Sequence, residues 1–508
     1  SKWELVVCSY YSENTSVQLI HFGGGEETYQ AWWGVPEAKL FGSEADLQAH
    51  IARNGYSPKD SANLVNSDPR TYNYYTYDNE VDNYKQDHFQ FHWTQSISNN
   101  LTSSLALNLT NGRGFYEQYN ENGNEDYITR KWLDNQFFVF NYNLNYTTAN
   151  NNLTFGSTYS EYDGDHFGET IWAQNSGDIQ FTDLFYNGNG LKKDFSNFIK
   201  TVYQLSDGLS IYADFQIRKI DYVTTGSTSN VDELAVDKSY SFFNPKAGFN
   251  YNFNNENKAY FSVSRAYREP TRSDFENNLD IQPEELIDYE LGWQFNNKNL
   301  IFSTNFYFMN YKNQLVLTGA LDDVGTPVRE NSGKSFRKGV EFESVYSLNK
   351  KFVFSGNLSL SKNKNIDYIS NFDGQVINLG DTDISFSPEL ISSLNVSYTP
   401  KQNLNINLLY KYVGEQFLSN TESSVSKLDS YMTTDINIIY KFESPKYFSE
   451  VIITAMINNI FNKKYVANGY YYTYDDTWSV PGAVTTIEGT GYYPQAIRNF
   501  LFGVVLRL

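Results

Sequence analysis

The sequence has little of what a membrane-spanning helix, a disulfide framework or a nucleic-acid site needs. No apolar run approaches the roughly 20 residues that a membrane-spanning helix requires, so any membrane segment must be a strand. Cys8 is the only cysteine, which excludes an internal disulfide and a cysteine-based metal cluster. The net charge of -20 and the sequence pI near 4.7 argue against nucleic acid as a partner.

Aromatic and small polar residues dominate what is present. Aromatic residues make up 17% of the chain, with 42 Tyr and 37 Phe, while proline numbers only 12 and the mean hydropathy is -0.54. This composition suits extended segments joined by polar turns, although a secreted soluble β-repeat protein has a similar one. The 508 residues suffice for several soluble domains or for one very large barrel. The pattern of strands therefore has to decide between them.

The residues from Asn499 onward alternate as a strand with one purely apolar side. That side carries Phe500, Phe502, Val504, Leu506 and Leu508, opposite Leu501, Gly503, Val505 and Arg507. A soluble sheet would not normally end on such an uncovered edge, because unpaired backbone groups beside exposed apolar side chains invite aggregation. A strand that faces lipid and closes a barrel removes both problems. We interpret the preceding segments as the strands that lead to that closure.

About nineteen segments alternate in this way, and tight turns and long loops join them in strict alternation. They are residues 3–10, 15–22, 86–96, 101–110, 137–146, 153–162, 195–205, 209–223, 242–253, 258–267, 285–295, 300–311, 336–348, 352–361, 390–398, 403–412, 431–442, 450–460 and 499–508. Half-buried strands of a soluble sandwich alternate similarly, but a charged side repeated this often favours a water-filled lumen. The predicted fold is an all-β, transmembrane, antiparallel β-barrel with periplasmic turns and extracellular loops.

The odd number of strands predicts a longer parent protein. If Leu508 ends at the periplasm and every tight turn is periplasmic, Ser1 lies on the extracellular side. A single-chain barrel of this type has an even number of strands and starts in the periplasm. We therefore expect residues 1–508 to be the C-terminal part of a barrel of about 22 strands, with the first strands and an N-terminal plug domain absent from this sequence.

Several stretches resemble the TonB-dependent outer-membrane receptors of Gram-negative bacteria, in their iron-complex branch. The segments that carry the resemblance are 261–275, with Arg268-Glu-Pro-Thr-Arg-Ser-Asp274 inside it, 282–292, 26–36, 84–92, 458–465 and 493–500. They span nearly the whole chain in the expected order. The resemblance implies energised uptake of a scarce ligand, commonly a ferric siderophore, with a plug domain inside the barrel and a TonB-binding segment at the N-terminus. Members usually end in an aromatic residue, from which Leu508 departs.

Aromatic clusters in the long external loops are the first candidates for ligand contact, because large amphipathic rings offer stacking area and a polar handle. Membrane-interface girdles also collect such rings, so each single residue has an equally good structural interpretation. The candidates are Trp32, Trp33, Tyr74, Tyr75, Tyr470, Tyr471, Tyr472 and Trp478. A short helix capped by Ser43 is predicted at 43–53, and we assign no chemistry to it.

Histidine and arginine supply the remaining candidates. His88 and His92 alternate onto the side opposite Phe89 and Trp93, which places them in the lumen, where lining or plug contact is favoured over metal or haem binding. Haem binding would need His50 or His166, which lie on predicted external loops, as an axial ligand. Arg268 belongs to a charged group with Arg265, Arg272, Glu269 and Asp274. These residues are expected to form ion pairs that order the loop or, less often, to contact ligand.

The leading hypothesis is a TonB-dependent transporter for a ferric siderophore in the outer membrane. Cobalamin or haem, and then an oligosaccharide or peptide, are the alternative ligands. The expected partners are outer-membrane lipid, a TonB-type energising protein and an outer-membrane lipoprotein or complex subunit, but no nucleic acid. Transport breaks no covalent bond, so no catalytic residue, resident metal or cofactor is expected. An outer-membrane hydrolase lacks a recognisable nucleophile motif here, whereas a structural scaffold barrel remains an alternative.

Overall fold

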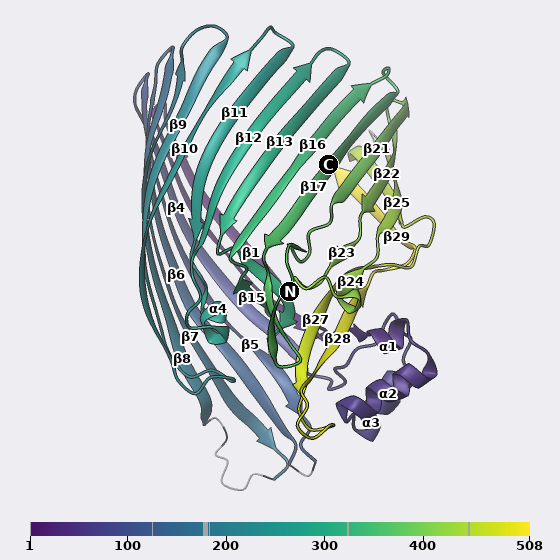
Figure 1. Cartoon of the computed structure of the whole chain (residues 1–508). Coiled ribbons are helices and arrows are strands. Elements are labelled where there is room, and N and C mark those ends of the chain that lie inside the picture. The colour runs from purple at the N-terminus through teal and green to yellow at the C-terminus, as the bar shows by residue number, and fades with distance from the viewer. Residues whose placement is uncertain are drawn as a thin grey trace.

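One large antiparallel sheet, curved into an open barrel, forms most of the molecule in a computed structural model (Figure 1). The structure describes residues 2–123, 125–175, 181, 183–322, 325–444 and 448–507, so the expectations for Ser1 and Leu508 lie outside the described residues. Each wall strand pairs with the next along the chain. The wall strands are β1 (Lys2–Tyr11), β2 (Thr15–Tyr29), β4 (Val81–Ser98), β5 (Leu101–Asn120), β6 (Tyr127–Thr147), β7 (Asn151–Ala173), β8 (Leu184–Gln204), β9 (Leu209–Gly226), β10 (Leu234–Asn252), β11 (Asn257–Arg268), β12 (Glu284–Asn296), β13 (Leu300–Lys312), β16 (Lys334–Ser347), β17 (Phe352–Ile366), β21 (Leu390–Lys401), β22 (Leu404–Val413), β25 (Tyr431–Ser444), β26 (Phe448–Asn458) and β29 (Asn499–Arg507).

This wall confirms the predicted fold class and the predicted strands. Each of the nineteen expected segments corresponds to one wall strand, and the short β20 (Thr382–Asp383) pairs beside β17 as the twentieth strand of the sheet. The apolar sides of the strands form the outer face, where large side chains are exposed: Ile217 is 63% exposed, Phe306 51% and Phe502 72%. On that face Phe502 of β29 lies opposite Ala455 of β26, which in turn lies opposite Ile438 of β25.

The wall strands are longer at the loop end than the sequence predicted. β5 continues to Asn120, β7 to Ala173, and β8 already begins at Leu184. The expected limits followed the alternation of apolar and polar residues, which weakens where both faces of a strand meet water. The backbone ladder continues past that point because its hydrogen bonds do not depend on which side chains face outward. The hairpins therefore extend well beyond the apolar band.

β1 and β29 are the two edges of the sheet. Within the part of the chain that the structure describes, β1 pairs only with β2, and β29 pairs only with β26. Side chains on both edge strands are widely exposed, including Leu5 at 66% and Leu501 at 60%. The described sheet is therefore open along one seam.

Small sheets and short helices gather at the loop end of the barrel (Figure 1). The sheets are β14 (Leu315–Leu321) with β15 (Pro327–Asn331), β18 (Ile369–Phe372) with β19 (Gln375–Asn378), β23 (Gln416–Phe417) with β24 (Lys427–Leu428), and β27 (Val466–Asp476) with β28 (Thr485–Pro494) and β3 (Val35–Pro36). The helices are α1 (Glu37–Leu40), α2 (Glu44–Asn54), α3 (Pro58–Asn66), α4 (Arg272–Asn277) and the 3-10 turn Ser424–Ser426. Among the described residues, no helix is both long enough and apolar enough to span a membrane.

The predicted helix near residues 43–53 is confirmed as α2. Ser43 is its N-cap, and its hydroxyl accepts a hydrogen bond from the Asp46 backbone N–H while the Asp46 carboxylate accepts from the Ser43 N–H. This reciprocal arrangement satisfies two backbone donors that a helix start leaves free. Leu47 anchors the helix in a small core with Val35, Leu64 and Tyr72.

A second small core lies inside the barrel. The segment that links β11 to β12 carries α4, and Phe275 of this helix is fully buried against Tyr222, with ring centroids 5.8 Å apart. Ile220 and Phe242 complete the contact from the inner faces of β9 and β10. The link therefore folds back onto the inner wall rather than projecting away from the barrel.

Candidate functional site

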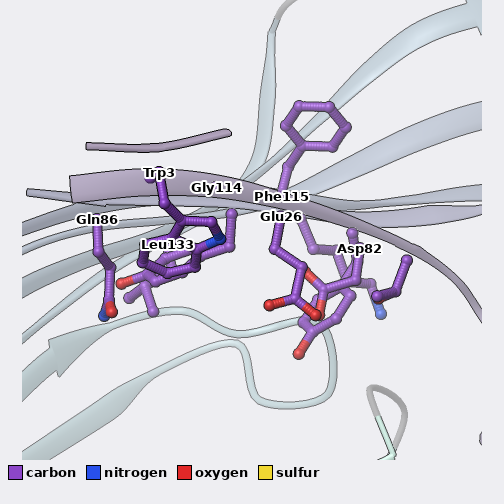
Figure 2. Close-up of a pocket in the computed structure, with 12 residues that line it drawn as sticks. Trp3, Glu26, Asp82, Gln86, Gly114, Phe115 and Leu133 are labelled. Atoms are coloured by element: carbon purple, nitrogen blue, oxygen red, sulfur yellow. The ribbon is translucent and has the colours of Figure 1, made fainter. Parts of the chain in front are cut away.

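The inner wall carries a hollow of about 450 Å³ near β1, β2, β4, β5 and β6. Figure 2 shows the Glu26 and Asp82 carboxylates on the same side of these strands, with Phe115 pointing to the opposite side. The missing side chain at Gly114 makes room for the neighbouring ring, because a Cβ there would lie 2.4 Å from the Tyr84 ring. This end of the inner wall is therefore acidic.

A second hollow of about 460 Å³ continues along the wall to α4. The two hollows share Tyr116, Lys131 and Leu133, so they form one continuous inner surface, which we call the lumen groove. Its second half contains both cations and aromatic rings beside the carboxylates of Glu276 and Asp322. The cationic and aromatic lining residues there are Lys131, Lys192, Arg272, His166, Tyr116, Tyr162, Tyr186 and Tyr222.

Arg272 is the cation that α4 brings into the lumen groove. Its Nε donates to Glu276 Oε1 at 2.8 Å, one helical turn away, and its Nη1 donates to Thr224 Oγ1 at 3.0 Å. The bond to Thr224 joins the helix to β9. The side chain is therefore held in place before any ligand arrives, which lowers the entropic cost of using it for recognition.

A buried ion network around Glu269, three residues before α4, fixes the segment between β11 and β12 to the wall. Glu269, 7% exposed, accepts from Lys192 of β8 and from both terminal nitrogens of Arg218 of β9, at 2.8 and 2.9 Å. Arg218 also donates through Nε to Asp194 at 2.8 Å. Burial raises the pKa of Glu269, but the two cations outweigh it and hold that pKa below its usual range.

These contacts confirm the expectation that the charged stretch forms ion pairs. Arg265 pairs with Glu285 at 2.8 Å, and Asp274, 2% exposed, pairs with Arg329 of β15. Arg268 instead donates to the backbone carbonyl of Leu315 at 3.3 Å. The partners come from other elements, which a reading of the stretch alone could not identify.

Most of the predicted aromatic candidates come together at the loop end. Trp32 meets Tyr75 edge to face with ring centroids 5.4 Å apart, and Trp33 meets Tyr470 at the same distance. Tyr74 contacts Tyr75 at 5.5 Å, and Tyr472 contacts Tyr470 at 6.2 Å. Burial raises the pKa of Tyr75 and of Tyr470 far above the usual range, so both remain neutral.

A hollow of about 490 Å³ opens beside this cluster. Trp33, Tyr74 and Tyr75 line it together with Lys59 and Glu80. Glu80 is 4% exposed, and burial raises the pKa of its carboxyl to about 7. Tyr75 is buried and belongs to the loop core, whereas Tyr74, 37% exposed, is accessible to a ligand from the hollow.

The other predicted candidates lie apart from this cluster. Tyr471 faces the opposite side of β27, where it donates to Glu488 at 2.6 Å and packs with Leu418. Trp478 is 69% exposed at the tip of the β27–β28 hairpin and stacks on Tyr474.

The histidines occupy different places. His88 and His92 lie on the inner face of β4, where His88 stacks on Phe22 with centroids 4.4 Å apart. His92 lies within hydrogen-bond distance of Gln90, at 3.2 Å. His50 lies on α2, but His166 lies within β7 and lines the lumen groove, so its expected place on an external loop was wrong. The ladder extends β7 past that residue.

Sequence reasoning missed several residues of the lumen groove. Tyr116, Tyr162, Lys192 and Tyr222 stand on parts of the wall strands that the expected limits left out or that carried no motif. Their signal was the continued alternation of residues above the apolar band, with every second side chain on the inner face. Strands extended by that rule would have placed Tyr116 and Lys192 in the lumen, whereas Tyr162 and Tyr222 already lay within predicted strands.

Three side chains on the outer face have the chemistry to hold a metal ion. Glu4, His21 and Asp87, from β1, β2 and β4, each offer a ligand atom, and these atoms lie within 4.8 Å of one another. Asp87 also pairs with Lys85 at 3.2 Å. The group lies on the same face as Phe89, on which His21 stacks, so it is outside the lumen groove.

Comparison with known proteins decides the family. A family model described as TonB dependent receptor-like, beta-barrel matches residues 33–460. The chain belongs to the TonB-dependent receptor family. Receptors of this family lie in the outer membrane of Gram-negative bacteria, so the apolar outer face meets lipid and the long loops lie outside the cell. No curated protein matches the receptor chain.

Solved structures resemble the receptor in fold. The ferric-catecholate import receptor Fiu of E. coli K12 has a TM-score of 0.67 at 15% identity, covering 97% of this chain and 72% of that one. The ferric citrate transporter FecA has a TM-score of 0.69 at 14% identity, covering 99% and 69%. The copper transporter OprC has a TM-score of 0.70 at 12% identity, covering 99% and 72%. At these identities the likeness shows the shared fold alone.

Proposed function

We propose that this receptor imports a ferric siderophore, an anionic iron chelate with aromatic or carboxylate donor groups. The family is one of transporters rather than enzymes, and the lumen groove supplies the recognition. The observation that carries the proposal is the second half of that groove, where Lys131, Lys192 and Arg272 stand among tyrosine rings. Three cations beside the two lining carboxylates of Glu276 and Asp322 make this half of the groove less acidic than the chain as a whole, whose net charge is -20, and this supports an anionic ligand.

The ligand passes two surfaces in this proposal. The hollow beside Trp33 and Tyr74 meets it first, because stacking on the exposed Tyr74 ring needs little reorganisation. The cations of the lumen groove then draw it inward. Arg272 presents a planar, delocalised charge suited to carboxylate or catecholate oxygens, and its hydrogen bond to Thr224 already orients it.

A TonB-type partner supplies the energy in this proposal. Movement of a tightly bound ligand against its gradient needs work, and the described wall contains no group that provides it. A plug domain inside the barrel, as the family resemblance implies, would lie against the lumen groove and couple that partner to ligand release. Loss of uptake in cells without the TonB-type partner is the expected result.

Uptake of radiolabelled iron tests the ligand class. Cells lacking their own siderophore receptors would express the full-length receptor and receive iron complexes of catecholate, hydroxamate or carboxylate siderophores, with haem and labelled cobalamin in parallel. We expect saturable uptake of at least one anionic siderophore complex. Uptake of haem or cobalamin alone, or of no ligand at all, would contradict the proposal.

Arg272 provides the matching variants. Arg272→Gln is expected to raise the half-saturating concentration about tenfold, equivalent to losing one charged hydrogen bond, with little change in maximal uptake, whereas Arg272→Lys retains part of the affinity. Arg113→Gln is the control, because Arg113 lies on the outer face beside Asp134. An equal fall in maximal uptake for both Arg272 variants would point to a purely structural role.

A further inference from the structure

The hollow beside Trp33, Tyr74 and Tyr75, which we call the tyrosine hollow, has the opposite charge balance from the second half of the lumen groove. Three carboxylates and one cation line the tyrosine hollow: Asp60, Glu80, Glu121 and Lys59. The second half of the lumen groove has three cations beside two carboxylates. The two surfaces therefore favour ligand groups of opposite charge.

Aromatic rings line much of the tyrosine hollow: Trp33, Tyr74, Tyr75, Tyr77, Tyr119 and Tyr127. The face of such a ring is electron-rich and attracts a cation. One cation of the protein already has this environment, because the Lys59 ammonium lies 5.4 Å from the centre of the Tyr119 ring and pairs with Glu121 at 2.8 Å. The hollow thus combines rings and carboxylates, the two kinds of group that stabilise a bound cation.

Glu80 is the most buried carboxyl of this lining, at 4% exposed. It accepts a hydrogen bond from the Tyr119 backbone N–H at 3.3 Å. Among the described residues no cation lies within ion-pair distance of it, since Lys59 pairs with Glu121 instead. Burial raises the pKa of the carboxyl to about 7, because a buried negative charge is unfavourable. A cationic ligand group would pair with this carboxylate and offset the cost of its burial.

Tyr75 brings a second polar group to the tyrosine hollow. The residue is 7% exposed, and its buried hydroxyl has no hydrogen-bond partner in the part of the chain that the structure describes. Trp32 meets the Tyr75 ring edge to face, but the Trp32 Nε1 is likewise buried without a partner there. Buried polar atoms are hydrogen-bonded in the great majority of cases. A tyrosine oxygen accepts as well as donates, so Tyr75 retains the capacity to accept an N–H from a ligand.

The phenol of Tyr74 indicates the sign of the electrostatic potential in the tyrosine hollow. Burial raises its pKa, and the charges of Asp60, Glu121 and Glu80 raise it further. A phenol becomes negative when it ionises, so neighbouring carboxylates oppose that step where the potential is negative. Because Tyr74 is 37% exposed, this potential extends to the opening of the hollow and attracts cations from solvent.

We propose that the tyrosine hollow binds a primary ammonium or guanidinium group of the imported iron complex, which donates N–H bonds to Glu80 and Tyr75. The surrounding rings cover the apolar arm that carries this charge. The inference rests on the proposed function, in which the cations of the lumen groove bind the anionic iron centre. The ligand is then dipolar, and different surfaces of one receptor bind its anionic and cationic groups. A quaternary ammonium has no N–H to donate, so it pairs less well with the two oxygens.

Titration with small fluorinated probes tests the tyrosine hollow without any iron complex. The full-length receptor in detergent is titrated at pH 8, above the pKa of Glu80, and fluorine NMR measures the dissociation constant of each probe. The probes are para-fluorobenzyl compounds with an ammonium, guanidinium, trimethylammonium or hydroxyl group, and para-fluorobenzoate. We expect the ammonium and guanidinium probes to bind at least about tenfold more tightly than the other three. Equal binding of the alcohol, or tighter binding of the benzoate, would overturn the proposal.

Glu80→Gln keeps the size of the side chain and removes its charge. This variant should bind the ammonium and guanidinium probes at least about tenfold more weakly than the wild type, and the alcohol within about threefold of the wild type. Glu44→Gln is the control, because Glu44 is exposed on α2 outside the lining and its substitution removes the same charge. Equal weakening in both variants would indicate a general effect of net charge and would contradict the proposal.

Tyr75→Phe remains informative if Glu80→Gln fails to fold, because it retains the ring that packs on Trp32. Loss of the hydroxyl should weaken binding of the ammonium and guanidinium probes by about threefold to tenfold. Binding of the trimethylammonium probe should change by less than about twofold, because that probe has no N–H to donate. Equal weakening of the ammonium and trimethylammonium probes would contradict the role of Tyr75 as an acceptor.

Iron uptake separates this inference from the proposed function. Cells that express the full-length receptor receive the iron complex of a tris-catecholate chelator with one terminal amine, or the same complex after acetylation of that amine. Acetylation should raise the half-saturating concentration about tenfold for the wild type but not for the Glu80→Gln variant. Equal uptake of both complexes by the wild type would overturn the inference and leave the proposed function intact. Probe binding without uptake of any iron complex would contradict the proposed function alone.

Discussion

Glu269 shows how a single side chain decides where the link between β11 and β12 lies. Its carboxylate is buried and accepts from Lys192 and Arg218 on two different wall strands. Removing one partner of a buried ion group leaves the remaining charges without compensation. Because the link carries Arg272 into the lumen groove, the position of that cation depends on Glu269 as well as on the packing of Phe275.

Glu269→Gln is expected to loosen the link by about 2–4 kcal/mol, since Lys192 and Arg218 lose their shared carboxylate. Hydrogen exchange of residues 270–283 should accelerate, while exchange within β9 remains slow. The control is Glu161→Gln, because Glu161 meets Lys193 only at 4.0 Å and both side chains are largely exposed. Unchanged protection of the link in the Glu269 variant would show that the core around Phe275 alone holds it.

Glu80 makes the packing of the aromatic cluster depend on pH. Burial raises the pKa of this carboxyl from 4.5 to about 7, and the Tyr119 N–H donates to it at 3.3 Å. A group with a raised folded pKa binds its proton more tightly in the folded state. The protonated Glu80 carboxyl therefore stabilises the folded segment fully below about pH 4.5, and this stabilisation is lost as the pH rises through 7.

Local opening of residues 74–80 should accordingly become easier between pH 5 and pH 8. Hydrogen exchange, corrected for its intrinsic pH dependence, measures the free energy of that opening. Glu80→Gln should abolish the pH dependence, because the amide remains neutral throughout. Glu44→Gln, an exposed position on α2, should leave it intact. A Glu80 variant with the wild-type pH profile would assign the effect to another group.

Chemistry at single positions was predictable from the sequence, but contacts were not. The aromatic residues near Trp32, Tyr74 and Tyr470 were identified as a group because rings of this kind recur in the long loops. Which ring packs on which depends on β28 pairing with β3, a contact that spans most of the chain. The partners of Glu269 and Asp274 likewise come from elements far away in sequence. Local patterns carry no information about such distant neighbours.

At the scale of single elements, α2 was the most predictable part of the loop region. Its start carries a capping Ser43 and an acidic Asp46 three residues later, both of which form the expected hydrogen bonds. The helix α3 has a similar start at Ser57, followed by Pro58, but its apolar pattern is shorter and did not predict a helix. Most strands of the small sheets were missed because they have only two to seven residues, which give little measurable alternation, whereas β27 and β28 fell within a segment that was interpreted as one long loop.

Ser43→Ala should destabilise α2 by about 1 kcal/mol, because one helix N–H loses its partner. The change is local, so faster hydrogen exchange is expected in the first turn of α2 and in its contact with Leu64, but not in the barrel wall. Ser61→Ala is the matched control, since Ser61 lies inside α3, where alanine is the better helix former. Equal effects of both substitutions would indicate that the cap contributes nothing.

The wall strands were predictable for a physical reason that also sets the limit of the prediction. In the band that meets lipid, every second side chain must be apolar, so the sequence alternates and the nineteen segments stand out. Above that band the same strands continue with water on both sides. Their sequence there is free to vary, which is why β5, β6 and β7 extend beyond their expected ends. The lumen groove lies largely in this unconstrained part.

At the scale of the whole molecule, the orientation of the sheet decides every other assignment, and β13 allows a direct test of it. Phe306 is 51% exposed on the outer face, seven residues into the strand from its tight-turn end, near the middle of the apolar band. Ser303 points to the inner face of the same strand, since its side alternates with Phe302 and Thr304. The same substitution at both positions compares lipid with lumen at two sites three residues apart on one strand.

Phe306→Lys should lower the free energy of unfolding in phospholipid bilayers by about 2–4 kcal/mol, because a lysine near the midplane must take its charge into hydrocarbon. Ser303→Lys should cost less than about 1 kcal/mol, because its ammonium stays in the water of the lumen. Urea titration of vesicle-inserted protein, followed by tryptophan fluorescence, measures both. A larger cost at Ser303 than at Phe306 would mean that the sheet is turned inside out, and the lumen groove would then face lipid.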